Sequence, residues 1–210
     1  MTITVPTATT PIVHVVDDDD AVRDSLRFLL EQVGLTVQTY DNGAALLSAD
    51  IPPAGCILTD FHMPGIDGLQ LQAGLAGQGI RLPVIVMTGY GDVPIAVRAL
   101  KMGAVDFLEK PFEDGQLLNA VKLALDGNAR ALAATARAAT AQERITQLTP
   151  RECEVLDLLV GGKSNKEIAK VLGTSPRTID VHRARVLHKL AVSNLPDLVH
   201  LVLAARATPP

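Results

Sequence analysis

The sequence predicts an α/β fold, a doubly wound five-stranded parallel sheet, followed by a small all-α domain of four helices that contains a helix-turn-helix. Three observations predict it. Short apolar runs alternate with helical patterns over the first half of the chain, and polar residues stand where several of these runs end. Closely spaced helix-capping signals with basic residues fill the last third.

Five short runs rich in β-branched and apolar residues predict the strands. They are IVHVV (12–16), TVQTY (36–40), GCILTD (55–60), PVIVMTG (83–89) and AVDFLEKP (104–111). Helical patterns lie between and after them at about 21–33, 43–49, 67–77, 93–102 and 113–126. Five such units predict an open sheet with strands buried on both faces, whose ligand site lies outside the carboxyl ends of the strands.

The last third begins with residues 126–148, which are rich in Ala with scattered Arg and Gln and indicate an exposed, partly helical linker. Three capping signals follow: Thr149 with Pro150 and Glu152, Ser164 with Glu167, and Ser175 with Pro176. A last helix is expected from about Leu195. Two short helices joined by a tight glycine turn, the second of them basic, predict a helix-turn-helix.

These patterns divide the chain into four parts: a flexible N-terminal arm (1–10), the sheet domain (11–127), the linker (128–147) and the helical domain (148–206). Residues 1–142 carry 9 basic and 16 acidic residues, whereas residues 143–210 carry 10 basic and 7 acidic ones. An acidic N-terminal part and a basic C-terminal part indicate two different functions, and the basic part is expected to bind nucleic acid.

The composition, 48% hydrophobic and 20% charged, is that of an ordinary globular protein with a real core. No apolar run approaches the ~18 residues of a membrane span, and the N-terminus does not resemble a secretory signal, so a cytoplasmic protein is expected. Cys56 and Cys153 lie far apart in apolar contexts and are expected to be buried thiols without chemistry.

Polar residues gather where the predicted strands end. Asp17 and Asp18 follow the first, Asp60 ends the third, and Thr88 and Lys110 end the fourth and fifth. Taken alone, the aspartate run 17–20 also suits a solvated turn with a helix N-cap. The convergence of carboxylates from separate segments favours a hard-oxygen pocket for a divalent cation, with Mg²⁺ expected, and Asp19 and Asp20 are expected to start the next helix.

The motifs VVDDD, LTDFHMPGIDG, VMTGYGD and AVDFLEKPF resemble the receiver domain of two-component response regulators over about residues 11–127. The resemblance implies the following roles: Asp60 as phosphoacceptor, Asp17 and Asp18 with Asp60 and the His62 backbone carbonyl at the Mg²⁺ site, Thr88 as switch hydroxyl, Lys110 as phosphoryl contact and Phe107 as switch aromatic. It also implies a cis Lys110–Pro111 peptide.

Blander interpretations of single positions remain open at this stage. Phe107 suits ordinary core, Thr88 a strand end and Lys110–Pro111 a plain turn, and the His62 imidazole is an alternative metal ligand.

The helix at 93–102 with the strand at 104–109 is the expected surface for dimerisation on phosphorylation. Val97 and Lys101, one helical turn apart, are its candidate residues.

On the basic helix, Ile179, Val186 and Leu190 share one side and are expected in the core. The opposite side carries the residues expected to enter the major groove of DNA: Arg177, Thr178, Val181, Ala184, Arg185 and His188. Lys163, Lys166 and Lys189 are expected to contact phosphates. Arg183 points toward the core side, where an ion pair with Glu152 or Glu154 is favoured over DNA contact, and His182 is expected to be a packed histidine.

Residues 148–190 resemble the output domain of LuxR/NarL-type regulators, and with the receiver the chain is most similar to the FixJ subgroup. The resemblance implies a DNA-binding transcription regulator rather than an enzyme. It also implies that a sensor histidine kinase phosphorylates Asp60, and that the homodimer then binds double-stranded promoter DNA and regulates transcription with RNA polymerase, with activation expected.

Two other classes compete with this interpretation. A phosphatase or phosphotransferase with an aspartyl intermediate requires a carboxylate two residues beyond Asp60, where the chain has His62. A phosphorelay module that does not touch DNA is disfavoured by the basic face of helix 175–190.

Overall fold

The computed structural model describes residues 10–89 and 93–206, so most of the expected N-terminal arm and positions 90–92 of the motif VMTGYGD lie outside the described residues. The chain divides into two compact units, Met1–Leu132 and Ala133–Pro210. Within the described ranges, no helix is long and apolar enough to cross a membrane.

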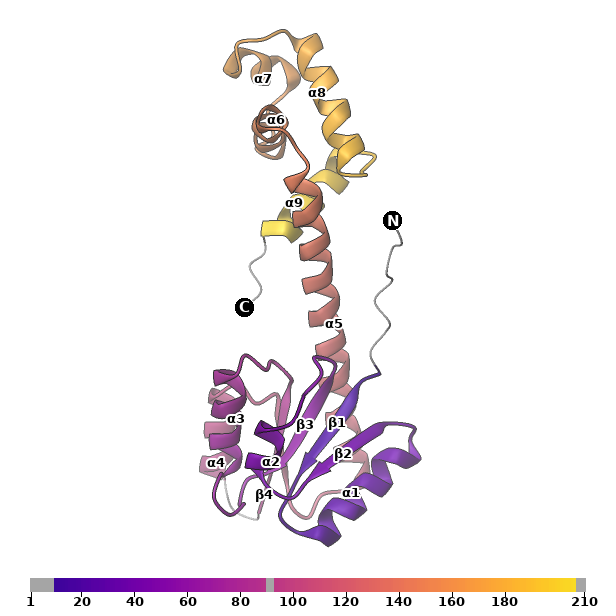
Figure 1. Cartoon of the computed structure of the whole chain (residues 1–210), viewed down its shortest axis with the longest axis vertical. Coiled ribbons are helices and arrows are strands. Elements are labelled where there is room, and N and C mark those ends of the chain that lie inside the picture. The colour runs from indigo at the N-terminus through magenta and orange to yellow at the C-terminus, as the bar shows by residue number, and fades with distance from the viewer. Residues whose placement is uncertain (1–9, 90–92, 207–210) are drawn as a thin grey trace. The chain divides into compact units, whose positions relative to one another are not determined.

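The first unit is built on a parallel sheet with the strand order β2-β1-β3-β4-β5 (Figure 1). The strands are β1 (Ile12–Val16), β2 (Thr36–Tyr40), β3 (Gly55–Asp60), β4 (Val84–Thr88) and β5 (Asp106–Glu109). In register, Ile12 of β1 lies opposite Thr36 on one side and Gly55 on the other. The predicted doubly wound α/β fold is confirmed.

Helices cover both faces of this sheet. They are α1 (Asp20–Gln32), α2 (Gly43–Leu47), α3 (Gly68–Gly77), α4 (Val93–Lys101) and α5 (Asp114–Thr146). On one face Leu30 of α1 and Leu117 of α5 pack with Val15 and Leu58. On the other face Leu46 of α2, Leu71 of α3 and Ala99 of α4 pack with Ile57 and Val86. The three inner strands are therefore almost fully buried, whereas β2 and β5 are half-exposed edges.

Gly55 shows why β1 and β3 can start side by side. Its φ is +150°, and a Cβ atom there would lie 2.0 Å from the Ile12 carbonyl oxygen. A side chain at this position cannot coexist with the observed pairing. The amide of Asn128 completes the junction, accepting from the Gly55 N–H and donating to the Pro53 carbonyl.

The helix α5 is continuous over 33 residues, so the segment 128–146 is helical throughout rather than partly helical. Near its end Ala141 is buried and Ile145 packs against the core of the second unit.

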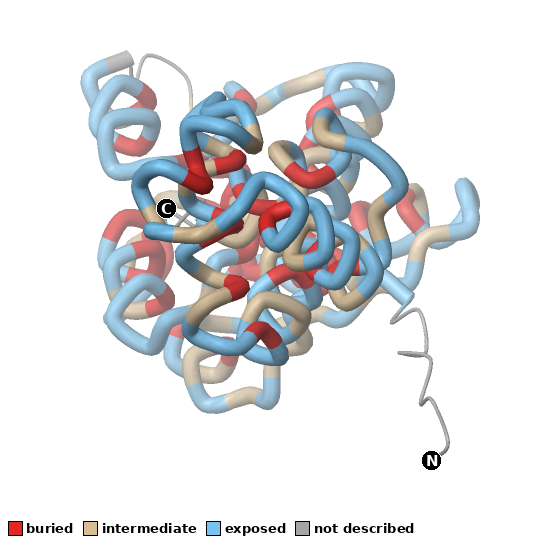
Figure 2. The backbone as a smooth tube through the Cα atoms, turned by 90° about the horizontal axis from the view of Figure 1, so that it is seen from above, coloured by how far each residue is buried: buried red, intermediate tan, exposed pale blue. Residues whose placement is uncertain are grey.

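The described part of the second unit continues with four further helices: α6 (Pro150–Val160), α7 (Asn165–Val171), α8 (Pro176–Lys189) and α9 (Leu195–Arg206). The predicted N-caps Thr149, Ser164 and Ser175 are all present, the first two as complete capping boxes. Gly173, with φ +62°, ends α7 as predicted. Buried residues, red in Figure 2, alternate with exposed ones along the helices, as amphipathic packing requires.

Candidate functional site

The strand ends bring together an acidic pocket in the first unit. Asp17 follows β1, Asp60 ends β3, Thr88 ends β4 and Lys110 follows β5. All four side chains come from the carboxyl edge of the sheet, where the fold class predicts a ligand site. Asp17, Asp60 and Thr88 are buried, whereas Lys110 is half-buried and Asp18 is exposed.

Lys110 joins the two buried carboxylates. Its Nζ atom donates to Asp17 Oδ2 at 2.7 Å and to Asp60 Oδ1 at 2.6 Å. Its backbone N–H donates to the Thr88 carbonyl at 2.7 Å, which ties the end of β5 to the end of β4. Burial by itself lowers the pKa of Lys110, but the hydrogen bonds to Asp17 and Asp60 outweigh it, and the pKa is raised. Lys110 is therefore a fixed cation at neutral pH. The Lys110–Pro111 peptide is cis, as predicted.

Asp60 is held from its other side by the chain that follows it. The His62 N–H donates to Asp60 Oδ2 at 2.7 Å. Gly68 permits this turn, because a Cβ atom there would lie 2.9 Å from the Asp60 carbonyl oxygen. Burial raises the pKa of Asp60 above its usual range, while Lys110 opposes that rise. The carboxylate is thus a partly desolvated anion with one cationic neighbour.

The carboxylates at the carboxyl edge of the sheet suit a hard divalent cation. Asp17 and Asp60 both reach the single position that the Lys110 ammonium takes, so their oxygens already converge on a cation. Among the described residues no group of three His, Cys, Asp or Glu side chains is arranged to hold a metal ion. Asp18 follows Asp17 directly at the end of β1 and is exposed, and its place in the Mg²⁺ site stays a prediction. Two carboxylates still suit Mg²⁺, which commonly takes one or two of them and keeps several waters.

Thr88 and Phe107 occupy neighbouring strands. Thr88 is 2% exposed at the end of β4, and Phe107 on β5 is 38% exposed. The interpretation of Phe107 as ordinary core is wrong, because β5 is an edge strand and its side chain turns outward. A cavity of about 620 Å³ lies beside it, lined among others by Phe107, Lys110 and Gln116. The candidate dimer residues Val97 and Lys101 are both exposed on α4.

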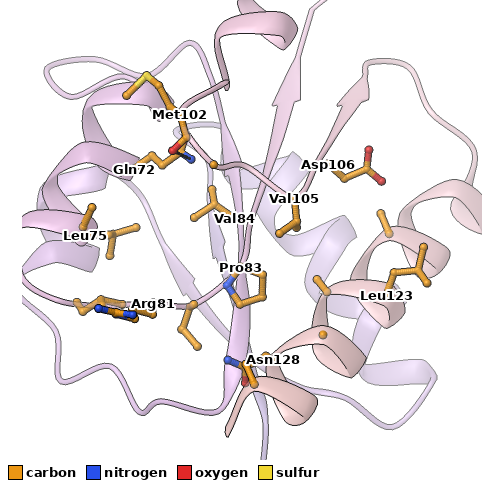
Figure 3. A pocket seen from close by; sticks show the side chains of 18 residues that line it. Gln72, Leu75, Arg81, Pro83, Val84, Met102, Val105, Asp106, Leu123 and Asn128 are labelled. Carbon is orange, nitrogen blue, oxygen red and sulfur yellow. Dashed lines mark hydrogen bonds between the residues drawn. The ribbon is translucent and has the colours of Figure 1, made fainter. Parts of the chain in front are cut away.

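A second cavity, of about 540 Å³, contains none of the predicted site residues (Figure 3). It lies around the start of β4 and the approach to β5, where Pro83, Val105 and Leu123 contribute apolar walls. The cysteines also stay outside the site. Burial raises the pKa of the Cys56 thiol to about 12, and Cys153 is only half-buried.

In the second unit, α8 has the predicted two sides. Ile179, Val186 and Leu190 are fully buried. The expected base-reading residues are all exposed: Arg177, Thr178, Val181, Ala184, Arg185 and His188. Lys163 and Lys166, expected to contact phosphates, are exposed as well.

The ion pairs of this unit differ from those predicted. Glu152 binds Lys189 at 2.7 Å, and Glu154 binds Arg151, so the expected pair of Arg183 with either glutamate is wrong. Arg183 donates instead to Asn165. The side chain of Lys189, expected to contact phosphate, turns back toward the buried Glu152 and the Gln147 carbonyl. His182 is half-buried, and its Nδ1 atom is buried without a hydrogen-bond partner among the described residues.

Two contacts that hold these sites in place were not predicted from the sequence, one at the acidic pocket and one at the end of α8. Arg23 donates from Nη1 to the Asp17 carbonyl at 2.6 Å and so fixes the turn after β1. Arg144, near the end of α5, donates to the Leu190 carbonyl at the end of α8. The Arg144 contact has no local signal, because it joins residues 46 positions apart and depends on how the helices pack. The Arg23 contact spans only six positions, but a backbone carbonyl as acceptor leaves no residue type to recognise in the sequence.

Comparison with known proteins agrees with this geometry. Residues 13–122 match the family model of the response regulator receiver domain, and residues 146–202 match that of bacterial regulatory proteins of the luxR family. The transcriptional regulatory protein FixJ of Azorhizobium caulinodans is 50% identical over 94% of this chain and 94% of its own length. FixJ of Bradyrhizobium diazoefficiens is 44% identical over 92% of this chain and 95% of its own length.

Solved structures give the same answer for the fold. The response regulator StyR covers 92% of this chain and 98% of its own, with 41% identity and a TM-score of 0.79. Full-length FixJ from B. japonicum covers 94% and 98%, with 43% identity and a TM-score of 0.60. The chain therefore belongs to the response regulators that join a receiver domain to a LuxR-type DNA-binding domain, and it is a homologue of FixJ.

Proposed function

We propose that this protein is a cytoplasmic response regulator that accepts a phosphoryl group on Asp60 from a sensor histidine kinase, dimerises, and binds promoter DNA to activate transcription with RNA polymerase. The observation that carries the proposal is the bridge from Lys110 to both Asp17 and Asp60 at the carboxyl edge of the sheet. It gives the candidate nucleophile a fixed cation and a second acidic group at one point.

The chemistry follows from charge. A carboxylate oxygen of Asp60 attacks phosphorus, the bond from phosphorus to the donor's leaving group breaks, and an acyl phosphate remains. Both reactants are anionic, so positive charge at the reacting centre lowers the barrier. Asp17, Asp18, Asp60 and the His62 backbone carbonyl would hold Mg²⁺, which would supply part of that charge. The Lys110 ammonium supplies the rest by contacting a phosphoryl oxygen.

Phosphorylation then changes the packing next to Asp60. The Thr88 hydroxyl turns to donate to the new phosphoryl oxygens and vacates space, and Phe107 rotates inward from its present outward position. The local charge change thereby alters the surface of α4 and β5. Exposed apolar side chains on that surface, Val97, Leu100 and Val105, are then available to a second copy.

Dimerisation supplies the affinity for DNA. One helix-turn-helix makes few contacts, and joining two can raise avidity by roughly 10²–10⁴ without a new contact. Half-sites should lie about one helical turn, ~10 bp, apart or at a multiple of that spacing. In each copy the exposed face of α8 reads bases, and Lys163 and Lys166 hold phosphates. We assign Lys189 to the internal pair with Glu152 rather than to DNA.

The test compares wild-type protein with Asp60→Asn, treated with acetyl phosphate with and without Mg²⁺. Intact-mass spectrometry should find one added phosphoryl group on the wild type only when Mg²⁺ is present, and none on Asp60→Asn. Light scattering should then show a dimer for the phosphorylated wild type alone. Selection from a random duplex pool should recover paired half-sites for that dimer. Phosphorylation of Asp60→Asn at the wild-type rate would overturn the proposal.

A further inference from the structure

An acidic side chain stands at the edge of the proposed DNA-reading face. Asp180 is exposed on α8 and lies one turn from both Arg177 and Ala184, which belong to that face. A carboxylate in this position repels a polyanion, so its presence on a helix that enters the major groove needs a compensating role.

Its hydrogen-bond partner indicates that role. Asn165, the first residue of α7, donates from Nδ2 to Asp180 Oδ1. The oxygen of the same amide accepts a long hydrogen bond of 3.5 Å from Nη1 of Arg183. Asp180 and Arg183 are three residues apart on α8, so a single amide from α7 contacts two neighbouring positions of one helix face.

The Asn165 amide satisfies both partners at once. The carboxylate of Asp180 needs a donor and the guanidinium of Arg183 needs an acceptor, and a primary amide presents one of each. An aspartate at position 165 would keep the acceptor but place like charges together. An alanine would supply neither contact.

The hydrogen bonds of Asn165 to Asp180 and Arg183 are directional, whereas the apolar contacts of α7 and α8 are not. Ile168, Ala169 and Ile179 belong to the apolar core of this unit, which sets the face that each helix turns inward but tolerates small rotations of a helix about its axis. Hydrogen bonds restrict those small rotations further, because they weaken steeply when misaligned. The phosphate-binding lysines lie on or just before α7 and the base-reading side chains on α8, so this rotation sets the register between them.

We propose that Asn165 is a positioning residue for DNA recognition, which, through Asp180 and Arg183, locks the rotation of the reading helix relative to the phosphate-binding helix. The inference rests on the proposed DNA binding. It assigns to Asp180 the task of orienting the reading face rather than of contacting a base.

The test exchanges the two side chains. The full-length phosphorylated protein is measured by fluorescence anisotropy on the duplex that wild type selects from a random pool, on every single-base variant of it, and on a scrambled duplex. Asn165→Ala and Asp180→Ala should each weaken binding to the selected duplex by about 3- to 10-fold, the cost of a lost hydrogen bond. Binding of Asn165→Ala to the scrambled duplex should stay within about twofold, since it depends on charge and this variant keeps the charge. Asp180→Ala removes a repulsive charge, so it should bind the scrambled duplex slightly more tightly while it loses affinity for the selected one. The order of preference among the base variants should not change.

Asn165→Asp should weaken specific binding more than Asn165→Ala does. The double variant Asn165→Asp with Asp180→Asn restores a donor opposite an acceptor with the polarity reversed, and its affinity should return to within about twofold of wild type. Asn194→Asp is the matched control, because it also turns an exposed Asn–Asp hydrogen bond, here with Asp197, into a like-charge pair outside α7 and α8. It should leave DNA binding unchanged. Melting temperatures report whether each variant folds, and Asp180→Ala with the double variant keeps the test decisive if Asn165→Asp unfolds.

Three results would overturn the inference. Tighter binding of Asp180→Ala to all duplexes would make Asp180 a plain repulsive charge. A changed base preference at one position would make it a base contact, with a cytosine amino group as the natural donor. A double variant as weak as Asn165→Asp would remove the coupling. If wild type selects no sequence at all, the proposed function fails instead, and the two failures are distinct.

Discussion

The Lys110 ammonium lies 2.6 Å from Oδ1 of Asp60, although 50 residues separate them in the chain. The contact ties the end of β5 to the end of β3 across the intervening strand β4. A change in the charge of Asp60 therefore acts directly on Lys110, which precedes the cis peptide bond to Pro111. Through Lys110 it acts on the edge strand β5, which carries Phe107.

We expect Lys110→Ala to slow the phosphorylation of Asp60 by acetyl phosphate about 10²-fold, because one fixed positive group is removed from the reacting centre. Time courses by intact-mass spectrometry at saturating Mg²⁺ measure the rate. Lys122→Ala, which removes an exposed lysine from α5 of the same unit, should react like wild type. Equal rates for Lys110→Ala and wild type would show that the ammonium has no part in the chemistry.

Val97→Glu combined with Lys101→Glu should keep the phosphorylated protein monomeric. Val97 is 45% exposed on α4, and a carboxylate there opposes burial against a second copy. Val33→Glu makes the same change at a 53% exposed valine after α1 and should still dimerise. Light scattering after phosphorylation gives the mass of each variant. A full dimer from the α4 variant would place the contact elsewhere.

Arg177→Ala and Lys166→Ala should affect DNA binding in different ways. Loss of the exposed Arg177 should cost about 1–3 kcal/mol on the selected duplex and relax the preference for one base. Loss of Lys166 should weaken all duplexes evenly and lower the salt slope by about one unit. Anisotropy titrations at several salt concentrations separate the two. Arg137→Ala, an exposed change on α5, should match wild type, and a salt slope unaltered by Lys166→Ala would exclude a phosphate contact.

Lys189→Ala should destabilise the second unit by about 1–3 kcal/mol, because Glu152 is buried and loses its ion-pair partner. Arg206→Ala breaks the exposed pair with Asp157 and should cost under about 1 kcal/mol.

The hydrogen bonds from Lys189 and Thr149 lower the pKa of Glu152 from 4.5 to about 2. Its contribution to stability is therefore complete above pH 4.5 and is lost as the pH falls toward 2. Urea unfolding at a series of pH values, followed for both variants, checks this; equal losses for the two would contradict it.

His14 should make the first unit less stable in mild acid. It is fully buried in β1, where Nδ1 contacts the Tyr40 hydroxyl at 3.1 Å and Nε2 has no partner among the described residues. Burial lowers the pKa of His14 below 6.5, so the unfolded chain binds the proton first and stability falls as the pH drops below 6.5. NMR titration of the imidazole should give that lowered pKa, and His14→Gln should flatten the stability profile in this range. An imidazole that titrates at or above 6.5 would refute the prediction.

The sequence predicts most of this architecture because its signals are local. The strands, the capping residues Asp19, Thr149 and Ser164, and the polar strand ends all depend on neighbours within a few positions. The pairings of Lys189 and Arg183 are different, because helical spacing gives the side of α8 on which a residue lies but not which acidic residue or amide the packed helices bring to it. The exposure of Phe107 has the same origin. The residue pattern of a single strand does not show whether the strand lies at the edge or in the middle of the sheet, because that depends on the strand order.

The second half of α5 determines where the chain can be divided into fragments that fold. Its composition marks residues 128–147 as a connector, yet Ala141 is buried, Ile145 packs into the core of the helical unit and Arg144 binds the end of α8. Backbone hydrogen-bonded in a helix resists proteases, which need an extended substrate, so limited digestion should not separate the two units at the Ala-rich stretch. A C-terminal fragment that begins at Leu148 loses these contacts. The smallest piece that carries the complete core begins before Ala141.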